Sequence, residues 1–167
     1  MVKIITGKIN STKTTKIKNH YLKYKTGDGI ISKKVMIDKN VFGYTAVRLS
    51  DNLEFPLMIH DTFYKKGLYQ NDEIFDKNIC GQIGPYKIYQ KGMKKVNAIY
   101  KELFKNKISP LYFDEIGKLE IQGSGFYKIL KKAIKKDINL IITVREDLIE
   151  EIVDKLNISN YEIIGGW

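Results

Sequence analysis

The chain has 167 residues, of which 43% are hydrophobic and 29% are charged, and this composition suits a single globular domain over residues 1–167. No apolar run approaches the roughly 20 residues that span a bilayer, and the apolar start of the chain is too short for a signal peptide. The single cysteine, Cys80, excludes a disulfide framework, and the two histidines lie too far apart to suggest a metal cluster. We therefore expect a cytoplasmic protein without a membrane partner.

The formal net charge of +10 has two explanations. A basic surface attracts polyanions, such as nucleotides or nucleic acid. The high content of Lys, Ile, Asn and Tyr, which A/T-only codons encode, would give the same charge in an AT-rich genome. We favour this second explanation because the sequence has no Arg-rich tract and no aromatic RNA-binding signature. Nucleic acid is therefore expected to be at most a weak, nonspecific partner whose binding depends strongly on salt.

The beginning of the chain has the layout of a phosphate-binding loop. Residues 2–6 are a β-branched run that predicts a strand, and residues 13–25 show helical spacing. Between them, Gly7 and Lys13-Thr14-Thr15 match most of the pattern G-x-x-x-x-G-K-[ST]. The backbone N–H groups of such a loop wrap a phosphate chain, while Lys13 would reach the outer phosphates and the Thr14 hydroxyl would bind Mg²⁺. The predicted nucleotide-binding residues are Gly7, Lys8, Ile9, Asn10, Ser11, Thr12, Lys13, Thr14 and Thr15.

One position departs from this pattern, because Thr12 stands where the second glycine belongs. Asn10 offsets the change in part, since asparagine tolerates left-handed backbone conformations better than most residues. The alternative interpretation is a polar turn between a strand and a Lys-rich helix. The loop alone does not decide between the two.

The segment after the first helix predicts three strands, at residues 30–37, 41–49 and 53–59. Their short connections require antiparallel pairing, because a parallel return needs a crossover of about a dozen residues. Pro56 suggests that the third strand is an edge strand or ends early. Residues 60–82 are poorly patterned, and we expect a loop whose aromatic side chains pack it onto the body or stack on a base.

Strands and helices alternate in the rest of the chain. Strands are expected at residues 84–89, 111–113, 138–144 and 161–164, and helices at 90–106, 124–136 and 147–156, with Ser124 as an N-cap. This alternation predicts a parallel sheet with right-handed crossovers. The sequence therefore predicts an α/β fold in which an antiparallel β-meander is inserted after the first helix.

A second motif lies at the end of the strand that begins at Leu111. Leu111-Tyr112-Phe113-Asp114-Glu115 is an apolar run that ends in an acidic pair, like the second signature of phosphate-loop NTPases. Because ligands of open α/β sheets bind at the carboxyl ends of the strands, Asp114 would hold Mg²⁺ and Glu115 would act as general base toward the attacking water. The alternative is a strand that ends in an ordinary Asp-Glu turn. The two motifs support each other, because they occur in the expected order and each at a strand end.

The acidic motif belongs to a longer run that resembles a known family. Residues 114–120 read Asp-Glu-Ile-Gly-Lys-Leu-Glu, with Ser124 and Phe126 shortly after them. This run is similar to the D-E-I-G-(K/R)-M-E-L-x-S-x-x-F signature of the THEP-type nucleoside-triphosphatases. Other segments resemble that family in the same order, namely Ile5-Thr6-Gly7, Gly43-Tyr44, Gly84 to Ile88 and Thr143-Val144-Arg145. The resemblance covers nearly the whole chain.

The resemblance implies a mostly parallel, RecA-like P-loop sheet flanked by helices, which hydrolyses nucleoside triphosphates with Mg²⁺ and little base selectivity. It also implies that the strand at residues 138–144 lies between the loop strand and the acidic strand. Arg145 would then emerge beside the γ-phosphate and stabilise charge in the transition state. The alternative is that Arg145 pairs with Glu146 or Asp147 as an ordinary surface residue.

Two other functions remain open. The same core supports a nucleotide-dependent kinase of a nucleoside or an RNA end, but such kinases usually carry an Arg-bearing lid, and Arg48 and Arg145 are the only arginines in the sequence. The other is a non-catalytic nucleotide or nucleic-acid binding module with a degenerate loop. The family loop is usually G-x-P-G-V-G-K-T-T, so Asn10 and Thr12 replace two of its glycines, and a Cβ at Thr12 could crowd the phosphate.

Overall fold

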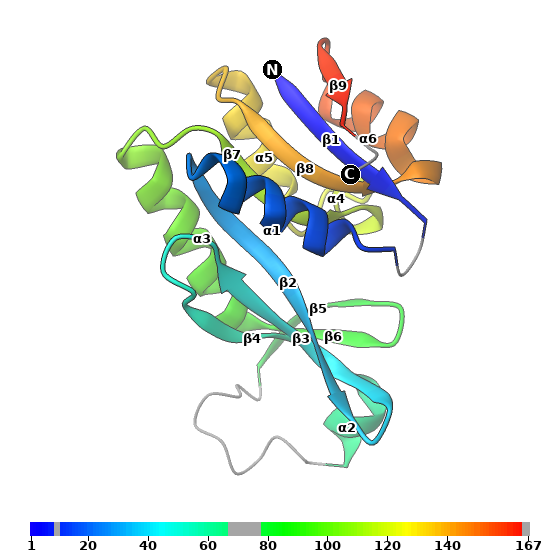
Figure 1. The fold of residues 1–167 in the computed structure, drawn as a ribbon. Helices are drawn as coiled ribbons and strands as arrows, with labels where there is room; N and C mark the ends of the chain where they lie inside the picture. Colours follow the sequence, from blue (N-terminus) through cyan, green and yellow to red (C-terminus); the bar gives the residue numbers. More distant parts are fainter. Residues whose placement is uncertain (9–10, 67–77, 165–167) are drawn as a thin grey trace.

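The computed structural model of the protein describes residues 1–8, 11–66 and 78–164. In chain order its strands are β1 (Val2–Gly7), β2 (Asp28–Ile37), β3 (Asn40–Arg48), β4 (Glu54–His60), β5 (Ile79–Ile83), β6 (Tyr86–Tyr89), β7 (Leu111–Ile116), β8 (Leu140–Arg145) and β9 (Tyr161–Ile163). The helices are α1 (Lys13–Tyr24), α2 (Asp61–Lys65), α3 (Gln90–Lys105), α4 (Lys118–Ile121), α5 (Tyr127–Lys135) and α6 (Ile149–Leu156), and a 3-10 turn, η1, covers Glu146–Leu148. The strands in these ranges form one sheet with the order β5-β6-β4-β3-β2-β7-β8-β1-β9 (Figure 1).

One part of the sheet is parallel and carries the predicted motifs. β8 pairs in parallel with β1 on one side and with β7 on the other, and β9 pairs in parallel with β1. Leu140 to Val144 of β8 are all buried, as expected for a parallel strand that is covered on both faces. Because these strands run in the same direction, their carboxyl ends lie at one edge of the sheet. The predicted α/β fold is confirmed, as is the position of β8 between the loop strand and the acidic strand.

Helices cover both faces of the parallel part. α1 lies on one face, and α3, α5 and α6 lie on the other (Figure 1). Ile17 of α1 packs with Tyr112 of β7, whereas the neighbouring Phe113 belongs to the larger core on the opposite face. This separation follows from the alternation of side chains along a strand. Ile17 and Tyr21 of α1 pack in this smaller core, whereas Leu22 is exposed.

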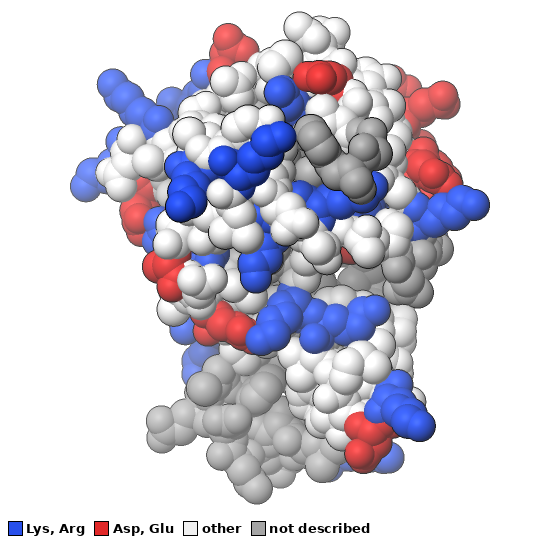
Figure 2. All heavy atoms as spheres, viewed as in Figure 1, with Lys and Arg blue, Asp and Glu red and all other residues white. Residues whose placement is uncertain are grey.

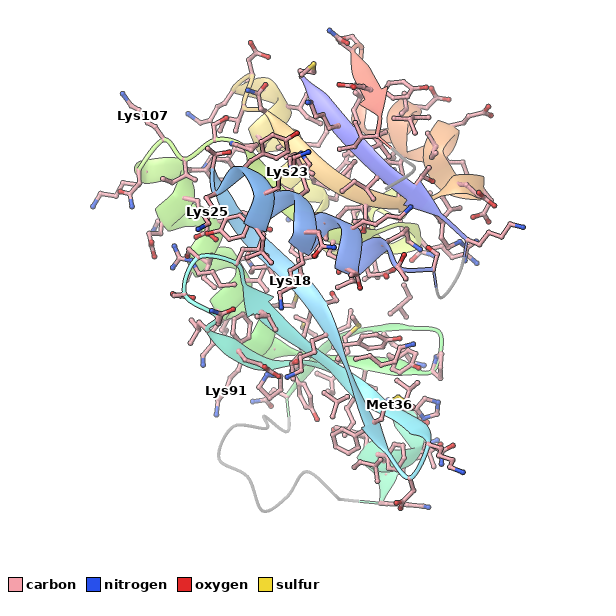
Figure 3. All side chains as sticks on the ribbon, viewed as in Figure 1. Lys18, Lys23, Lys25, Met36, Lys91 and Lys107 are labelled. Carbon is pink, nitrogen blue, oxygen red and sulfur yellow. The ribbon has the colours of Figure 1, made fainter. Side chains whose placement is uncertain are left out.

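The strands β2, β3, β4, β6 and β5 form the antiparallel part of the sheet, which we call the antiparallel extension, and the predicted meander is confirmed. β2 connects the two parts, because it pairs in parallel with β7 over residues 28–30 and antiparallel with β3 from Ile30 to Ile37. Beyond the pairing with β7, β2 runs on toward the hairpin that carries Met36 (Figures 1 and 3).

A buried ionic network fixes the start of the extension. Asp28 is 4% exposed and accepts hydrogen bonds from Arg48 Nε at 2.7 Å and from Ser50 Oγ at 2.8 Å. Arg48 also donates to Glu102 of α3 at 2.8 Å. The hydrogen bond to Glu102 and the one to Asp28 raise the pKa of the Arg48 guanidinium further above its ordinary value. Arg48 therefore ties β3 to β2 and α3, and does not reach over a ligand as a lid residue would.

Pro56 does not mark an edge strand, contrary to expectation. β4 pairs with β3 on one side and with β6 on the other. Proline is tolerated there for two reasons: the pairing with β6 begins only at Met58, and the register with β3 shifts next to Pro56.

Residues 60–82 also differ in part from the expected loop, because α2 and most of β5 lie in this range. The β5 strand forms because it pairs with β6, a tertiary interaction that the local sequence pattern does not signal. Residues 67–77, which include one of the tyrosines considered for base stacking, lie outside the described residues.

The segment between β7 and α5 is held by one buried carboxylate. Glu120 is 2% exposed, and its two oxygens accept hydrogen bonds from the backbone N–H groups of Gly117 at 2.8 Å and of Phe126 at 2.9 Å. We call this pair of hydrogen bonds the Glu120 clamp. The segment that it holds includes the short helix α4, which the sequence did not predict, and α5 begins only at Tyr127. Ser124 is therefore not the N-cap of α5, and Phe126 occupies that position.

Basic side chains lie over many elements. On the face shown in Figure 2, Lys and Arg side chains are spread out, with Asp and Glu side chains among them. The lysines that Figure 3 labels are exposed and lie on α1, on α3 and on the residues that follow these helices, namely Lys18, Lys23, Lys25, Lys91 and Lys107. Among the described helices, none has the length and apolar character that crossing a membrane requires.

Candidate functional site

The two sequence motifs meet at Asp114, at the carboxyl edge of the parallel strands. The Thr14 hydroxyl donates to Asp114 Oδ2 at 2.7 Å, and the Thr143 hydroxyl donates to Oδ1 at 2.6 Å. The Ser32 backbone N–H donates a further hydrogen bond to Oδ2 at 3.0 Å. The fold thus brings Thr14 and Asp114, which are 100 positions apart in the chain, into direct contact.

Asp114 is almost completely removed from solvent, with 1% of its surface exposed. Burial raises the pKa of its carboxyl group above the ordinary value, and the hydrogen bonds from Thr143, Ser32 and Thr14 oppose that rise. The same donors fix the direction of both carboxylate oxygens. The site therefore presents a buried, oriented carboxylate that a cation would stabilise.

Glu115 follows in a different backbone conformation. Its φ of 59° is left-handed, which is uncommon for a residue other than glycine. Its N–H donates to the Thr143 hydroxyl oxygen at 2.8 Å, so this one hydroxyl accepts from Glu115 and donates to Asp114. Because of this turn, the side chains of Asp114 and Glu115 point in different directions and have different surroundings.

The Glu115 residue is exposed as a whole, but charges surround its carboxyl group. Desolvation by the surrounding chain, and then the negative charge of Asp114, raise the pKa of Glu115. The positive charges of Lys13, Lys34 and Arg145 lower it. Because these cations come from α1, β2 and β8, three separate elements converge on this carboxylate.

Lys13, the lysine of the predicted phosphate-binding loop, is folded back onto the residues that precede it. Lys13 is 3% exposed, and its Nζ donates to the Lys8 carbonyl oxygen at 3.0 Å and to Ser11 Oγ at 3.4 Å. Gly7 fits closely against this turn, because a Cβ there would lie 2.6 Å from Ser11 Oγ. Lys13 is thus positioned inside the loop.

The unusual Thr12 does not strain this loop. Its φ of −77° is accessible to any residue, so the backbone needs no glycine at this position. Thr12 and Thr15 are exposed, and Thr14 is half-buried beside Asp114. Ile9 and Asn10 lie outside the described residues, so their predicted contacts stay predictions.

Arg145 is the last residue of β8. Its guanidinium forms a bidentate ion pair with Asp147, in which Nε donates to Oδ1 at 2.8 Å and Nη2 donates to Oδ2. The surface pairing that the sequence left as an alternative is therefore present, and it involves Asp147. Arg145 still lies near enough to Glu115 to lower the pKa of that carboxyl group.

Thr143 and Ser32 were not among the predicted site residues. Thr143 is completely buried, and it is the one hydroxyl-bearing residue in the apolar run of β8, two residues before the strand ends at Arg145. That position in the sequence could have signalled it. Ser32 contributes a backbone N–H, whose partner depends on the register of β2 against β7, and no side-chain pattern reveals such a register.

The oxygen donors around Asp114 suit magnesium. The residues in the described ranges contain no group of three or more His, Cys, Asp or Glu that could hold a metal. Mg²⁺ does not need such a group, because it is usually held by one or two carboxylates together with water and substrate phosphates. The adjacent Thr14 hydroxyl and Asp114 carboxylate match that donor set.

The sheet order and the loop at the end of β1 define the P-loop NTPase class of fold. The family model described as NTPase matches residues 3–164, and the chain therefore belongs to this family. Among solved structures, the fold is similar to that of THEP1 from the hyperthermophile Aquifex aeolicus, with a TM-score of 0.67, 18% sequence identity, and coverage of 99% of this chain and 89% of that chain. The resemblance to THEP-type proteins is thereby confirmed. No curated protein matches the sequence.

Proposed function

We propose that the protein is a Mg²⁺-dependent nucleoside-triphosphatase that releases phosphate from ATP, GTP and other nucleoside triphosphates with little base selectivity. The observation that carries this proposal is the direct contact between Thr14 of the loop and Asp114 of the acidic motif, at 2.7 Å. Membership of the NTPase family agrees with it. The expected lack of base selectivity follows only from the resemblance to THEP-type proteins.

The phosphate chain would bind to the backbone N–H groups of the loop and to the amino end of α1. Lys13 would exchange its present contacts with Lys8 and Ser11 for the outer phosphates. Thr14 and Asp114 would hold Mg²⁺, which neutralises phosphate charge when it is bound. Arg145 would add positive charge at the same edge.

Glu115 would act as the general base. Its carboxylate would take one proton from water while the water oxygen forms a bond to the γ-phosphorus. The bond from that phosphorus to the bridging oxygen breaks, and the diphosphate leaves. Thr143 would keep Glu115 in position through its hydrogen bond to the Glu115 N–H.

Replacement of Glu115 by glutamine tests this proposal. Glu115→Gln keeps the shape of the side chain and removes the base, so hydrolysis should fall by roughly 10²–10⁴-fold while nucleotide still binds. Glu151→Gln, at an exposed position on α6, is the control that should leave both properties unchanged. The measurements are release of inorganic phosphate and titration with a fluorescent nucleotide, both with Mg²⁺.

The same assays separate the alternatives. A parent protein that binds nucleotide and releases no phosphate would be a binding module. Phosphate transfer that appears only with an added nucleoside or RNA end would identify a kinase. Hydrolysis by Glu115→Gln at the parent rate would show that Glu115 is not the base.

A further inference from the structure

β2 extends beyond the parallel core at the edge where the candidate site lies. It pairs with β7 only from Asp28 to Ile30, and the Ser32 N–H then contacts Asp114 at 3.0 Å. The strand continues to Ile37 as part of the antiparallel extension. Since strand residues are spaced by about 3.3 Å, the backbone of Lys34 lies roughly 7 Å past Ser32, beyond the end of the core sheet.

The alternation of β2 places Lys33 and Lys34 on opposite faces. Lys33 is bound to Glu54, with Nζ at 2.9 Å and 3.1 Å from the two carboxylate oxygens. Lys34 lies on the other face, in register with Tyr44 of β3. The two adjacent lysines therefore have different surroundings, although they share type, exposure and strand.

Tyr44 connects the Lys34 face with the candidate site. Its ring packs edge-on against Tyr86 of β6, with 5.2 Å between the ring centroids. Burial and then the interaction with Tyr86 raise the pKa of Tyr44 to about 12, and the charge of Glu115 contributes to the rise. Lys34 in turn lowers the pKa of Glu115. The geometry agrees with these interactions, because Lys34 lies two strand positions after Ser32, whose N–H contacts Asp114, the neighbour of Glu115.

We infer that Lys34 is a further phosphate-binding residue, which the antiparallel extension brings to the γ-phosphate of a bound nucleoside triphosphate. The inference rests on the proposed function, because it concerns the same site. Lys13 belongs to α1 and Lys34 to β2, so the two lysines come to this site from different elements. Since a diphosphate lacks the γ-phosphate, Lys34 would let the site distinguish triphosphate from diphosphate.

The test compares Lys34→Ala with Lys33→Ala in the full chain. Affinity is measured, with Mg²⁺, for a non-hydrolysable triphosphate analogue and for the diphosphate of the same nucleoside. Because Lys34→Ala loses a charge-assisted contact, its affinity for the triphosphate analogue should be roughly tenfold or more weaker than that of the parent. Its affinity for the diphosphate should be nearly unchanged. Lys33→Ala should bind both ligands like the parent, and Lys34→Arg should retain most of the preference for triphosphate. Circular dichroism of each variant verifies that it is folded.

The outcomes separate this inference from the proposed function. If Lys34→Ala keeps the parent ratio of triphosphate to diphosphate affinity, the inference is overturned, whatever the hydrolysis rate. If the parent binds nucleotide without hydrolysing it, the proposed function fails, and the affinity ratio still decides the role of Lys34. A parent that binds neither ligand overturns both.

Discussion

Replacement of Thr143 by valine isolates the hydroxyl that joins the two acidic residues. Valine has nearly the same shape, so the completely buried site keeps its packing. The change removes the hydrogen bond to Asp114 at 2.6 Å and the bond from the Glu115 N–H at 2.8 Å. Hydrogen bonds to charged groups contribute about 1.5–3 kcal/mol, so we expect the free energy of unfolding to fall by about 2 kcal/mol. For a chain of this size, the melting temperature should fall by roughly 4–8 °C.

Thermal unfolding followed by circular dichroism, without nucleotide or Mg²⁺, measures this effect. Thr143→Ser is the matched control, because it keeps the hydroxyl and should retain most of the stability. Phosphate release should also fall in Thr143→Val, since the Glu115 N–H loses its partner. If Thr143→Val melts at the parent temperature, the hydroxyl does not stabilise Asp114, and the assignment of Thr143 to the site is wrong.

Three further predictions concern the loop, the metal and the connection between the two parts of the sheet. Lys13→Ala should abolish hydrolysis and weaken triphosphate binding far more than Lys8→Ala, and equal effects in the two assays would refute the loop assignment. Asp114→Asn should raise the Mg²⁺ concentration needed for half-maximal phosphate release and should also weaken nucleotide binding; an unchanged Mg²⁺ dependence would contradict the proposed ligand. Gly29→Ala would place a Cβ 2.1 Å from a backbone oxygen of β7, so urea denaturation should show a loss of stability of about 1–3 kcal/mol. Gly81→Ala, where the nearest side-chain atom lies at 3.5 Å, is its control and should not show that loss.

The parts of the site that the sequence predicted are those whose chemistry depends on residue type and spacing. The sequence alone shows a lysine and a threonine where a helix is expected to begin. It also shows an acidic pair where a strand is expected to end. The parallel sheet then brings Thr14 and Asp114 to one edge. The alternation of strands and helices was sufficient to predict that sheet, because parallel strands need crossover helices.

The parts that the sequence did not predict depend on backbone geometry. The Ser32 N–H reaches Asp114 only because β2 pairs with β7 in one particular register. The Glu120 carboxylate accepts hydrogen bonds from the backbone N–H groups of Gly117 and Phe126, which lie on either side of it in the chain. The predicted start of α5 at Ser124 was therefore wrong. Thr12 illustrates the converse case. The sequence departs there from a glycine of the family loop, whereas the φ of −77° shows that the backbone has no need for glycine at that position.

The extension and the candidate site form one arrangement because β2 belongs to both. Asp28 and Arg48 hold the start of β2 against β3 and α3, and the close approach of Gly29 fixes its distance from β7. Two residues after the β7 pairing ends, the Ser32 N–H contacts the buried carboxylate of Asp114. The direction in which β2 leaves the core is therefore set by contacts within the chain. The extension thereby brings Lys34, whose charge lowers the pKa of Glu115, toward the candidate site on a strand whose path is fixed by contacts within the chain. Under the proposed function, a charge held in this way would stabilise a transition state without a cost of reorganisation.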